Sequence, residues 1–130
     1  MTGKRENVLV VEDSLAVAKR LQISLERAGF LVDIARNGAQ ALAKAQRKHF
    51  DLVLTDEQMP VMSGHELCRE LRQDERYAHT PVIILTGGRS QLEASKLSED
   101  LHVAAIVDKP FNTESIVRLV EHELLEDRSR

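Results

Sequence analysis

Five short apolar runs, separated by segments with helical spacing, constrain the fold of this chain more than any other feature. Each run has the length of a strand and is rich in Val, Ile or Leu, and four are nearly continuous in apolar character. Such continuity predicts strands buried on both faces, as in a parallel sheet. The runs are Val8–Val11, Phe30–Ala35, Leu52–Thr55, Val82–Leu85 and Ala104–Val107.

The segments between and after these runs carry helix signals. Gly29 stands where a C-cap glycine is expected. Ser63–Glu66 and Ser90–Glu93 have the capping-box pattern, and Asn112 or Thr113 is expected to cap the last helix. The apolar positions of the five predicted helices are Leu15, Ala18, Leu21, Leu25 and Ala28; Ala41, Leu42 and Ala45; Leu67 and Leu71; Leu97 and Leu101; and Ile116, Leu119, Val120 and Leu124.

The alternation of strands and helices predicts an α/β fold, with a parallel sheet covered by helices on both faces and joined by right-handed crossovers. At 130 residues the chain has the length of one domain. In a sheet of this kind, functional groups gather beyond the carboxyl ends of the strands. The residues that follow each apolar run are therefore the candidates for chemistry.

Composition excludes several classes of protein. The chain is 42% hydrophobic and 30% charged, as expected of a soluble globular protein. Its net charge of −3 predicts no direct binding to nucleic acid or to an anionic membrane. The polar start MTGKREN has no signal-peptide core, and no apolar run approaches the roughly 20 residues that span a bilayer.

The single cysteine and the histidines are interpreted as structural residues. Cys68 can form no internal disulfide, which favours a reducing, cytoplasmic setting, and its place on a helix predicts a buried, inert thiol. The histidines have no metal-ligand spacing and are predicted to be surface or cap residues. They are His49, His65, His79, His102 and His122.

Charged and hydroxyl residues follow four of the five runs. Glu12 and Asp13 follow the first, Asp56 the third, Thr86 the fourth and Lys109 the fifth. Two carboxylates ~4 Å apart repel by about 4 kcal/mol at an effective dielectric near 20. One lysine does not neutralise three carboxylates, whereas Mg²⁺ binds a few carboxylates together with waters and phosphate oxygens. The cluster therefore predicts a metal site with room for a phosphoryl group.

Four motifs in this order resemble the receiver domain of two-component response regulators, and the chain is similar to single-domain regulators of the chemotaxis type. They are VLVVED at 8–13, DLVLTDEQMPVMSG at 51–64, VIILTG at 82–87 and DKPF at 108–111. The resemblance covers about residues 7–126 of a single domain 1–130, with a charged tail at 126–130. It implies a flavodoxin-like five-stranded sheet of order 2-1-3-4-5.

The resemblance also implies site roles. Asp56 matches the phosphoacceptor. Asp13 and Asp56 would ligate Mg²⁺ through their side chains, Glu12 mainly through water, and Gln58 through its backbone carbonyl. Lys109 would hold oxygens of the acceptor or of the phosphoryl group, and its peptide bond to the following proline is commonly cis in this family.

Conformational switching and lifetime are further expectations from the resemblance. Thr86 would move to bond the phosphoryl group and bias the face formed by the fourth helix, fifth strand and fifth helix. Ile106 stands where an aromatic ring often moves with the threonine, so the usual aromatic switch is in doubt. Gln58 and Gly88 occupy the positions that tune hydrolysis of the acyl phosphate. Glu57 replaces a commonly apolar residue, and the sequence offers no physical account of it.

The expected function is that of a phosphoacceptor that assists its own phosphorylation and dephosphorylation, not of an enzyme. The donor would be the phosphohistidine of a sensor histidine kinase or of a histidine phosphotransfer protein, and the output a downstream protein target. Phosphorylation-dependent dimerisation is left open, and so is whether the chain is a full single-domain regulator or a fragment.

Two alternatives compete with this interpretation. A receiver-like scaffold that is never phosphorylated is disfavoured by the intact acids, Thr86 and Lys109. An aspartyl-phosphate phosphatase would need a second acid two residues after the nucleophile, where this chain has Gln58.

Overall fold

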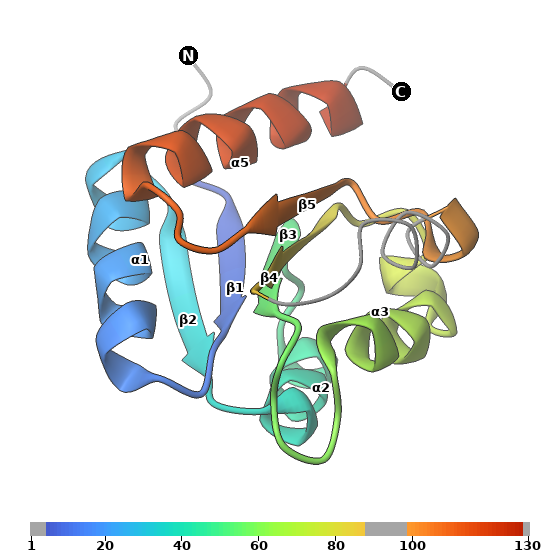
Figure 1. Ribbon diagram of the computed structural model, residues 1–130. Coiled ribbons are helices and arrows are strands. Elements are labelled where there is room, and N and C mark those ends of the chain that lie inside the picture. Colours follow the sequence, from blue (N-terminus) through green and yellow to red (C-terminus); the bar gives the residue numbers. More distant parts are fainter. Residues whose placement is uncertain (1–4, 88–98, 129–130) are drawn as a thin grey trace.

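The computed structural model describes residues 5–87 and 99–128 and contains one parallel sheet (Figure 1). Its strand order is β2-β1-β3-β4-β5, so the order implied by the resemblance is confirmed. Each predicted strand is found within one residue of its expected ends. The strands are β1 (Asn7–Val11), β2 (Leu31–Ala35), β3 (Leu52–Asp56), β4 (Val82–Thr86) and β5 (Ala105–Asp108).

Helices cover both faces of the sheet. Helices α1 and α5 lie against one face, and α2 and α3 against the other (Figure 1). The bounds are α1 (Leu15–Arg27), α2 (Gly38–Arg47), α3 (Gly64–Arg72), the short 3₁₀ helix η1 (Glu75–Tyr77) and α5 (Thr113–Arg128); residues 99–101 are also helical. The capping pattern Ser90–Glu93 and Leu97 lie outside the described residues. Over 5–87 and 99–128, no helix has both the length and the apolar character needed to cross a membrane.

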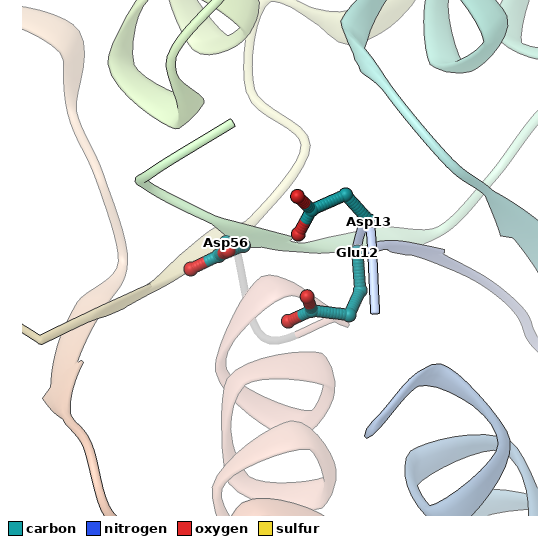
Figure 2. Close-up of side chains that lie close together, drawn as sticks. All are labelled: Glu12, Asp13 and Asp56. Atoms are coloured by element: carbon teal, nitrogen blue, oxygen red, sulfur yellow. The ribbon is translucent and has the colours of Figure 1, made fainter. Parts of the chain in front are cut away.

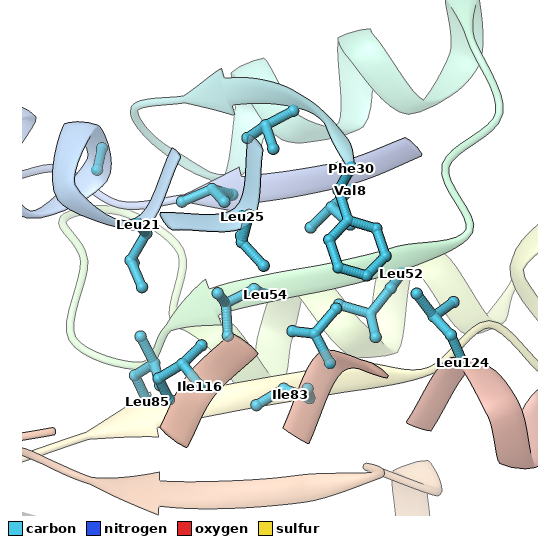
Figure 3. Packing of buried hydrophobic residues seen from close by; sticks show 14 residues of the cluster. Val8, Leu21, Leu25, Phe30, Leu52, Leu54, Ile83, Leu85, Ile116 and Leu124 are labelled. Carbon is cyan, nitrogen blue, oxygen red and sulfur yellow. The ribbon is translucent and has the colours of Figure 1, made fainter. Parts of the chain in front are cut away.

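Two apolar layers hold the helices to the sheet. Val8 and Val10 of β1 face α1 and α5, whereas Leu9 and Val11 face α2 and α3, because successive strand residues point to opposite sides. Figure 3 shows the first of these layers, in which side chains of α1 and α5 pack on β1, β3 and β4. Every residue of β3 and β4 is buried, as continuous apolar runs predict, whereas the edge strand β5 is only partly buried.

Local signals set the helix ends as predicted. Ser63 and Glu66 form the reciprocal capping box of α3. Asn112 Oδ1 accepts from the backbone N–H groups of Glu114 and Ser115 at the start of α5. Gly29 has φ +103°, directly after the last turn of α1. Helix α5 continues to Arg128, so the charged segment expected as a tail begins in helical conformation.

Tyr77 ties the amino-terminal edge of the sheet to α2. The ring is fully buried, and its hydroxyl lies 2.8 Å from Ala45 O and 2.9 Å from Lys48 O while it accepts from Phe50 N at 3.2 Å. We expect Tyr77→Phe to lower the free energy of unfolding by roughly 2 kcal/mol, because it leaves a buried N–H without its acceptor. Urea unfolding measures the change, with exposed His122→Ala as the control; equal midpoints for Tyr77→Phe and wild type would contradict it.

Candidate functional site: an acidic cluster at the carboxyl ends of the strands

The carboxyl ends of the strands bring the predicted acids together. Glu12 and Asp13 directly follow β1, and Asp56 is the last residue of β3. Figure 2 shows their carboxyl groups close together beside these strand ends, and one oxygen from each lies within 4.8 Å of the others. Glu12 and Asp56 are buried, whereas Asp13 is exposed. The predicted convergence of the three acids is therefore confirmed.

Lys109 and Thr86 complete the site from β5 and β4. Lys109 Nζ lies 2.8 Å from Asp56 Oδ1 and 3.9 Å from Glu12 Oε1. Its backbone N–H donates to Thr86 O at 2.8 Å, which joins the two strand ends, and the Lys109–Pro110 peptide is cis as the resemblance implied. Thr86 Oγ1 is buried and has no hydrogen-bond partner within the described part of the chain.

The charges at the site perturb one another. Burial raises the pKa of Glu12, and the nearby Asp56 charge adds to this rise, against the opposing effects of the Ser14 N–H and of Lys109. Burial alone would lower the pKa of Lys109, but its hydrogen bond to Asp56 and the charges of Asp56, Glu12 and Asp13 outweigh burial and raise it. One ammonium therefore stays charged beside three acids and compensates them only in part.

The donor set fits a hard divalent cation. All three acids offer oxygen ligands, and Glu12 Oε1 is buried without a hydrogen-bond partner in 5–87 and 99–128. A buried carboxylate oxygen that accepts no hydrogen bond is costly unless a cation or an ordered water meets it, and the Lys109 ammonium, Nζ, is 3.9 Å away. Mg²⁺ binds through a few carboxylates and keeps several waters, which an exposed ligand such as Asp13 permits.

The raised pKa of Glu12 predicts a pH-dependent stability of the metal-free protein. The folded state holds the Glu12 proton more tightly than the unfolded state, so this residue lowers stability as pH rises from its ordinary pKa of 4.5 to the higher folded value. Glu12→Gln has no proton to lose. We therefore expect the stability of Glu12→Gln relative to wild type to increase across that window. Urea unfolding in a chelator at a series of pH values measures it, and parallel curves would contradict it.

A backbone contact that sequence analysis missed holds Asp13. The Arg36 guanidinium donates to Asp13 O from Nη2 at 2.7 Å and from Nε at 3.3 Å. Arg36 follows β2, and that strand pairs in register with β1. No motif marks this residue, because the bond goes to a carbonyl and joins positions 23 residues apart.

Of three further residues expected to affect switching or the lifetime of the acyl phosphate, two lie in the described part of the chain, in different surroundings. Gln58 is exposed, and its Oε1 accepts from Gly87 N at 3.3 Å, which links the loop after β3 to the end of β4. Ile106 is partly buried and packs in the layer beneath α2 and α3. Gly88 lies outside the described residues.

The prediction that all five histidines are surface or cap residues is wrong for His65. This side chain is 3% exposed, and Glu57, 2% exposed, is its partner. Glu57 Oε1 accepts from His65 N at 2.9 Å and lies 2.7 Å from His65 Nδ1. The pair explains how an acid is tolerated at an apolar position, since a buried carboxylate needs donors. Cys68 is buried, as predicted, and burial raises the pKa of its thiol.

Curated relatives are similar in sequence to this chain over most of its length. It is 34% identical over 121 residues to the "Probable transcriptional regulator ycf29" of Porphyra purpurea, covering 93% of this chain and 57% of that protein. It is 32% identical over 117 residues to the "Transcriptional regulatory protein ResD" of Bacillus subtilis, covering 88% of this chain and 46% of that protein. The chain thus spans about half the length of the curated relatives it matches.

Solved structures and a family model agree on the domain. The chemotaxis protein CheY4 of Vibrio cholerae superposes with a TM-score of 0.86 at 33% identity, covering 92% of this chain and 98% of that one. A CheY-like receiver domain protein of Methanospirillum hungatei gives a TM-score of 0.89 at 28% identity, covering 97% and 98% of the two chains. The family model described as "Response regulator receiver domain" matches residues 8–121. With its sheet order and its acidic cluster beside Lys109, the chain belongs to the response regulator receiver domain family.

Proposed function

We propose that this receiver domain accepts a phosphoryl group on Asp56 from a phosphohistidine protein, with Mg²⁺ bound at the acidic cluster. The observation that carries the proposal is the position of Asp56. It ends a central buried strand, its Oδ1 lies 2.8 Å from Lys109 Nζ, and its carboxyl belongs to a three-acid cluster. Family membership supports pairing with a histidine kinase as a class of donor.

The proposed reaction transfers a phosphoryl group from an imidazole nitrogen of the donor to the carboxylate of Asp56. A carboxylate oxygen of Asp56 forms a bond to phosphorus, the phosphorus–nitrogen bond of the donor breaks, and its electron pair returns to the imidazole. Glu12, Asp13 and Asp56, with the backbone carbonyl of Gln58, would hold the metal. The bound metal supplies charge neutralisation and orientation of the phosphoryl oxygens.

Lys109 and Thr86 would respond to the new group. Phosphorylation converts the carboxylate that Lys109 contacts into an acyl phosphate, and the phosphoryl oxygens then offer Lys109 new acceptors close by. Thr86 Oγ1, buried and without a partner among the described residues, is a donor available to the same oxygens. Because Lys109 N bonds Thr86 O, a movement of either residue is passed to the ends of β4 and β5.

The surface that would carry the signal onward contains β5 and α5. The predicted fourth helix falls mostly outside the described residues. Ile106 lies in β5 and packs in the core without a hydroxyl or a ring, so the switch proposed here depends on Thr86 and the strand ends. The downstream target is a protein that binds this face when the receiver domain is phosphorylated.

The lifetime of the acyl phosphate would depend on Gln58 and Gly88. A water must be held in line with phosphorus for hydrolysis, and Gly88 has no side chain to hold one. The Gln58 oxygen already accepts from Gly87 N, which leaves its amide N–H₂ group as the donor that can meet a water. We propose a comparatively long-lived phosphorylated form.

Incubation with a small acyl phosphate donor tests the proposal against a receiver-like scaffold. We expect one phosphoryl group per chain to appear in intact-mass spectra when Mg²⁺ is present and far less in excess chelator. Transfer from a phosphorylated histidine phosphotransfer protein should give the same product. A chain that stays unmodified by both donors with Mg²⁺ present would assign the scaffold function instead.

A further inference from the structure

Glu57 and His65 form a buried polar pair that has no part in the proposed chemistry. One carboxylate oxygen, Glu57 Oε1, meets both the backbone N–H of His65 and its ring nitrogen Nδ1, at 2.9 Å and 2.7 Å. In the tautomer that carries the proton on Nδ1, the ring donates to this oxygen. Both side chains are at least 96% buried, so the pair is shielded from competing water.

The pair closes the loop that connects β3 to α3. At one end, Glu57 N donates to Leu85 O at 2.8 Å, which fixes the residue after Asp56 to β4. At the other end, Gly64 N donates to Glu57 O at 3.1 Å, and His65 bonds the Glu57 side chain. Glu57 therefore holds the first two residues of α3 through its backbone and its side chain together. Residues 58–63 are confined between these bonds.

The start of α3 also lies against the backbone of Asp56. A Cβ on Gly64 would stand 2.6 Å from Asp56 O and 3.1 Å from the Glu57 Cα. A shift of α3 toward the sheet would therefore displace the phosphoacceptor, and a shift away would open the loop that carries Gln58. His65, one residue further along α3, is placed to oppose both movements.

Filling the core does not by itself explain why a carboxylate and an imidazole occupy this buried position. An apolar pair of similar volume commonly packs as well as a buried ion pair, or better. What a polar pair adds is direction, because its hydrogen bonds hold over a narrow range of distance and angle. Directional bonds matter where a backbone group nearby must be kept in one place.

We propose that Glu57 and His65 are positioning residues of the metal site, which fix the β3–α3 loop so that the Gln58 backbone carbonyl faces the acidic cluster. This inference rests on the proposed function for the identity of Gln58 as a metal ligand. Partners that hydrogen-bond metal ligands directly typically contribute roughly 10- to 100-fold to metal affinity, and a pair that fixes the loop carrying the ligand acts on the same orientation.

The decisive variant is Glu57→Leu with His65→Leu, which replaces both members and leaves no buried charge unpaired. We expect its Mg²⁺ affinity, measured by calorimetric titration, to fall by roughly 10-fold or more. In the metal-free protein, we expect the backbone amides of the β3–α3 loop to exchange hydrogen faster than in wild type. Unchanged affinity and unchanged exchange would show that the pair only fills the core.

Two further variants separate positioning from general loss of stability. Tyr77→Phe destabilises the fold from the opposite edge of the sheet, and we expect it to leave Mg²⁺ affinity unchanged. A loss of Mg²⁺ affinity in Tyr77→Phe as large as that in the double variant would overturn the proposal. His65→Gln keeps a side-chain donor for Glu57, whereas His65→Leu removes it. We expect His65→Gln to retain a higher Mg²⁺ affinity than His65→Leu. If the double variant does not fold, this comparison is the test of the proposal.

Phosphorylation of wild type keeps this inference distinct from the proposed function. A wild-type chain that binds Mg²⁺ but takes no phosphoryl group refutes the proposed function and leaves the affinity series to judge the pair. A wild-type chain that is phosphorylated, alongside a double variant with wild-type affinity and exchange, refutes the positioning role alone.

Discussion

We expect Asp56→Asn to abolish phosphoryl uptake from both small-molecule and phosphohistidine donors while the domain stays folded. The amide is nearly isosteric with the carboxylate but is not a nucleophile for phosphorus. Stability should be equal to that of wild type or higher, because the variant removes one of three mutually repelling acids, although it also loses the ion pair with Lys109. Intact-mass spectra after incubation with donor and Mg²⁺ measure uptake, and urea unfolding measures stability.

Asp33→Asn is the matched control for this experiment. Asp33 lies on β2 and pairs with Lys48 at 3.4 Å, outside the acidic cluster. We expect it to take up phosphoryl groups at the wild-type rate. Modification of Asp56→Asn at the wild-type rate would show that the acceptor is another residue.

Gly64→Ala should be the most destabilising single methyl addition at the described glycines. The new Cβ would stand 2.6 Å from the backbone oxygen of Asp56, closer than van der Waals contact allows. Neither side can relieve this contact easily, because Asp56 lies in a central strand and Gly64 is held by its bond to Glu57 O. We expect a loss of about 3 kcal/mol in the free energy of unfolding, from overpacking at a rigid site.

Gly38→Ala is the comparison that tests whether the rigidity of the contacted backbone causes the loss in Gly64→Ala. Its Cβ would stand 2.5 Å from Met62 Sδ and 3.0 Å from Met62 Cγ and Cβ. Another methionine rotamer moves Sδ and Cγ away, and the remaining Cβ contact needs a shift of only a few tenths of an ångström. Alanine also favours a helix interior over glycine by about 1 kcal/mol, and by less at the first residue of a helix, where Gly38 lies. We therefore expect a change within about 1 kcal/mol for Gly38→Ala. Equal losses for the two variants in urea unfolding would contradict the account of the Gly64 contact.

The strands and the acidic cluster could be predicted from the sequence because their signals are local. Continuous apolar runs identified β3 and β4 as buried strands, and the acid or hydroxyl after each run pointed to a common edge of the sheet. Parallel strands place their carboxyl ends at one edge, and the order implied by the resemblance makes the first and third strands neighbours, so Asp13 and Asp56 could be expected near each other. The capping box of α3 likewise depends on residues three apart.

The supporting contacts could not be predicted, because each joins distant segments through a backbone group or an unexpected partner. Arg36 bonds a carbonyl 23 residues away, and the Tyr77 hydroxyl meets carbonyls 29 and 32 residues away. The sequence predicts a surface or cap position for His65, because a lone histidine at a helix start has no local mark of burial. Only the folded chain shows that Glu57 supplies its partner.

Mapping of the modified residue tests the central claim most directly. Wild-type protein is incubated with a small acyl phosphate donor and Mg²⁺, the acyl phosphate is reduced with borohydride, and the peptides are sequenced by mass spectrometry. The account predicts homoserine at position 56 and no reduced side chain at any other aspartate or glutamate. Homoserine at Asp13, or 5-hydroxynorvaline at Glu12 or Glu57, with Asp56 intact would contradict it, and so would a stable phosphoryl group on a histidine.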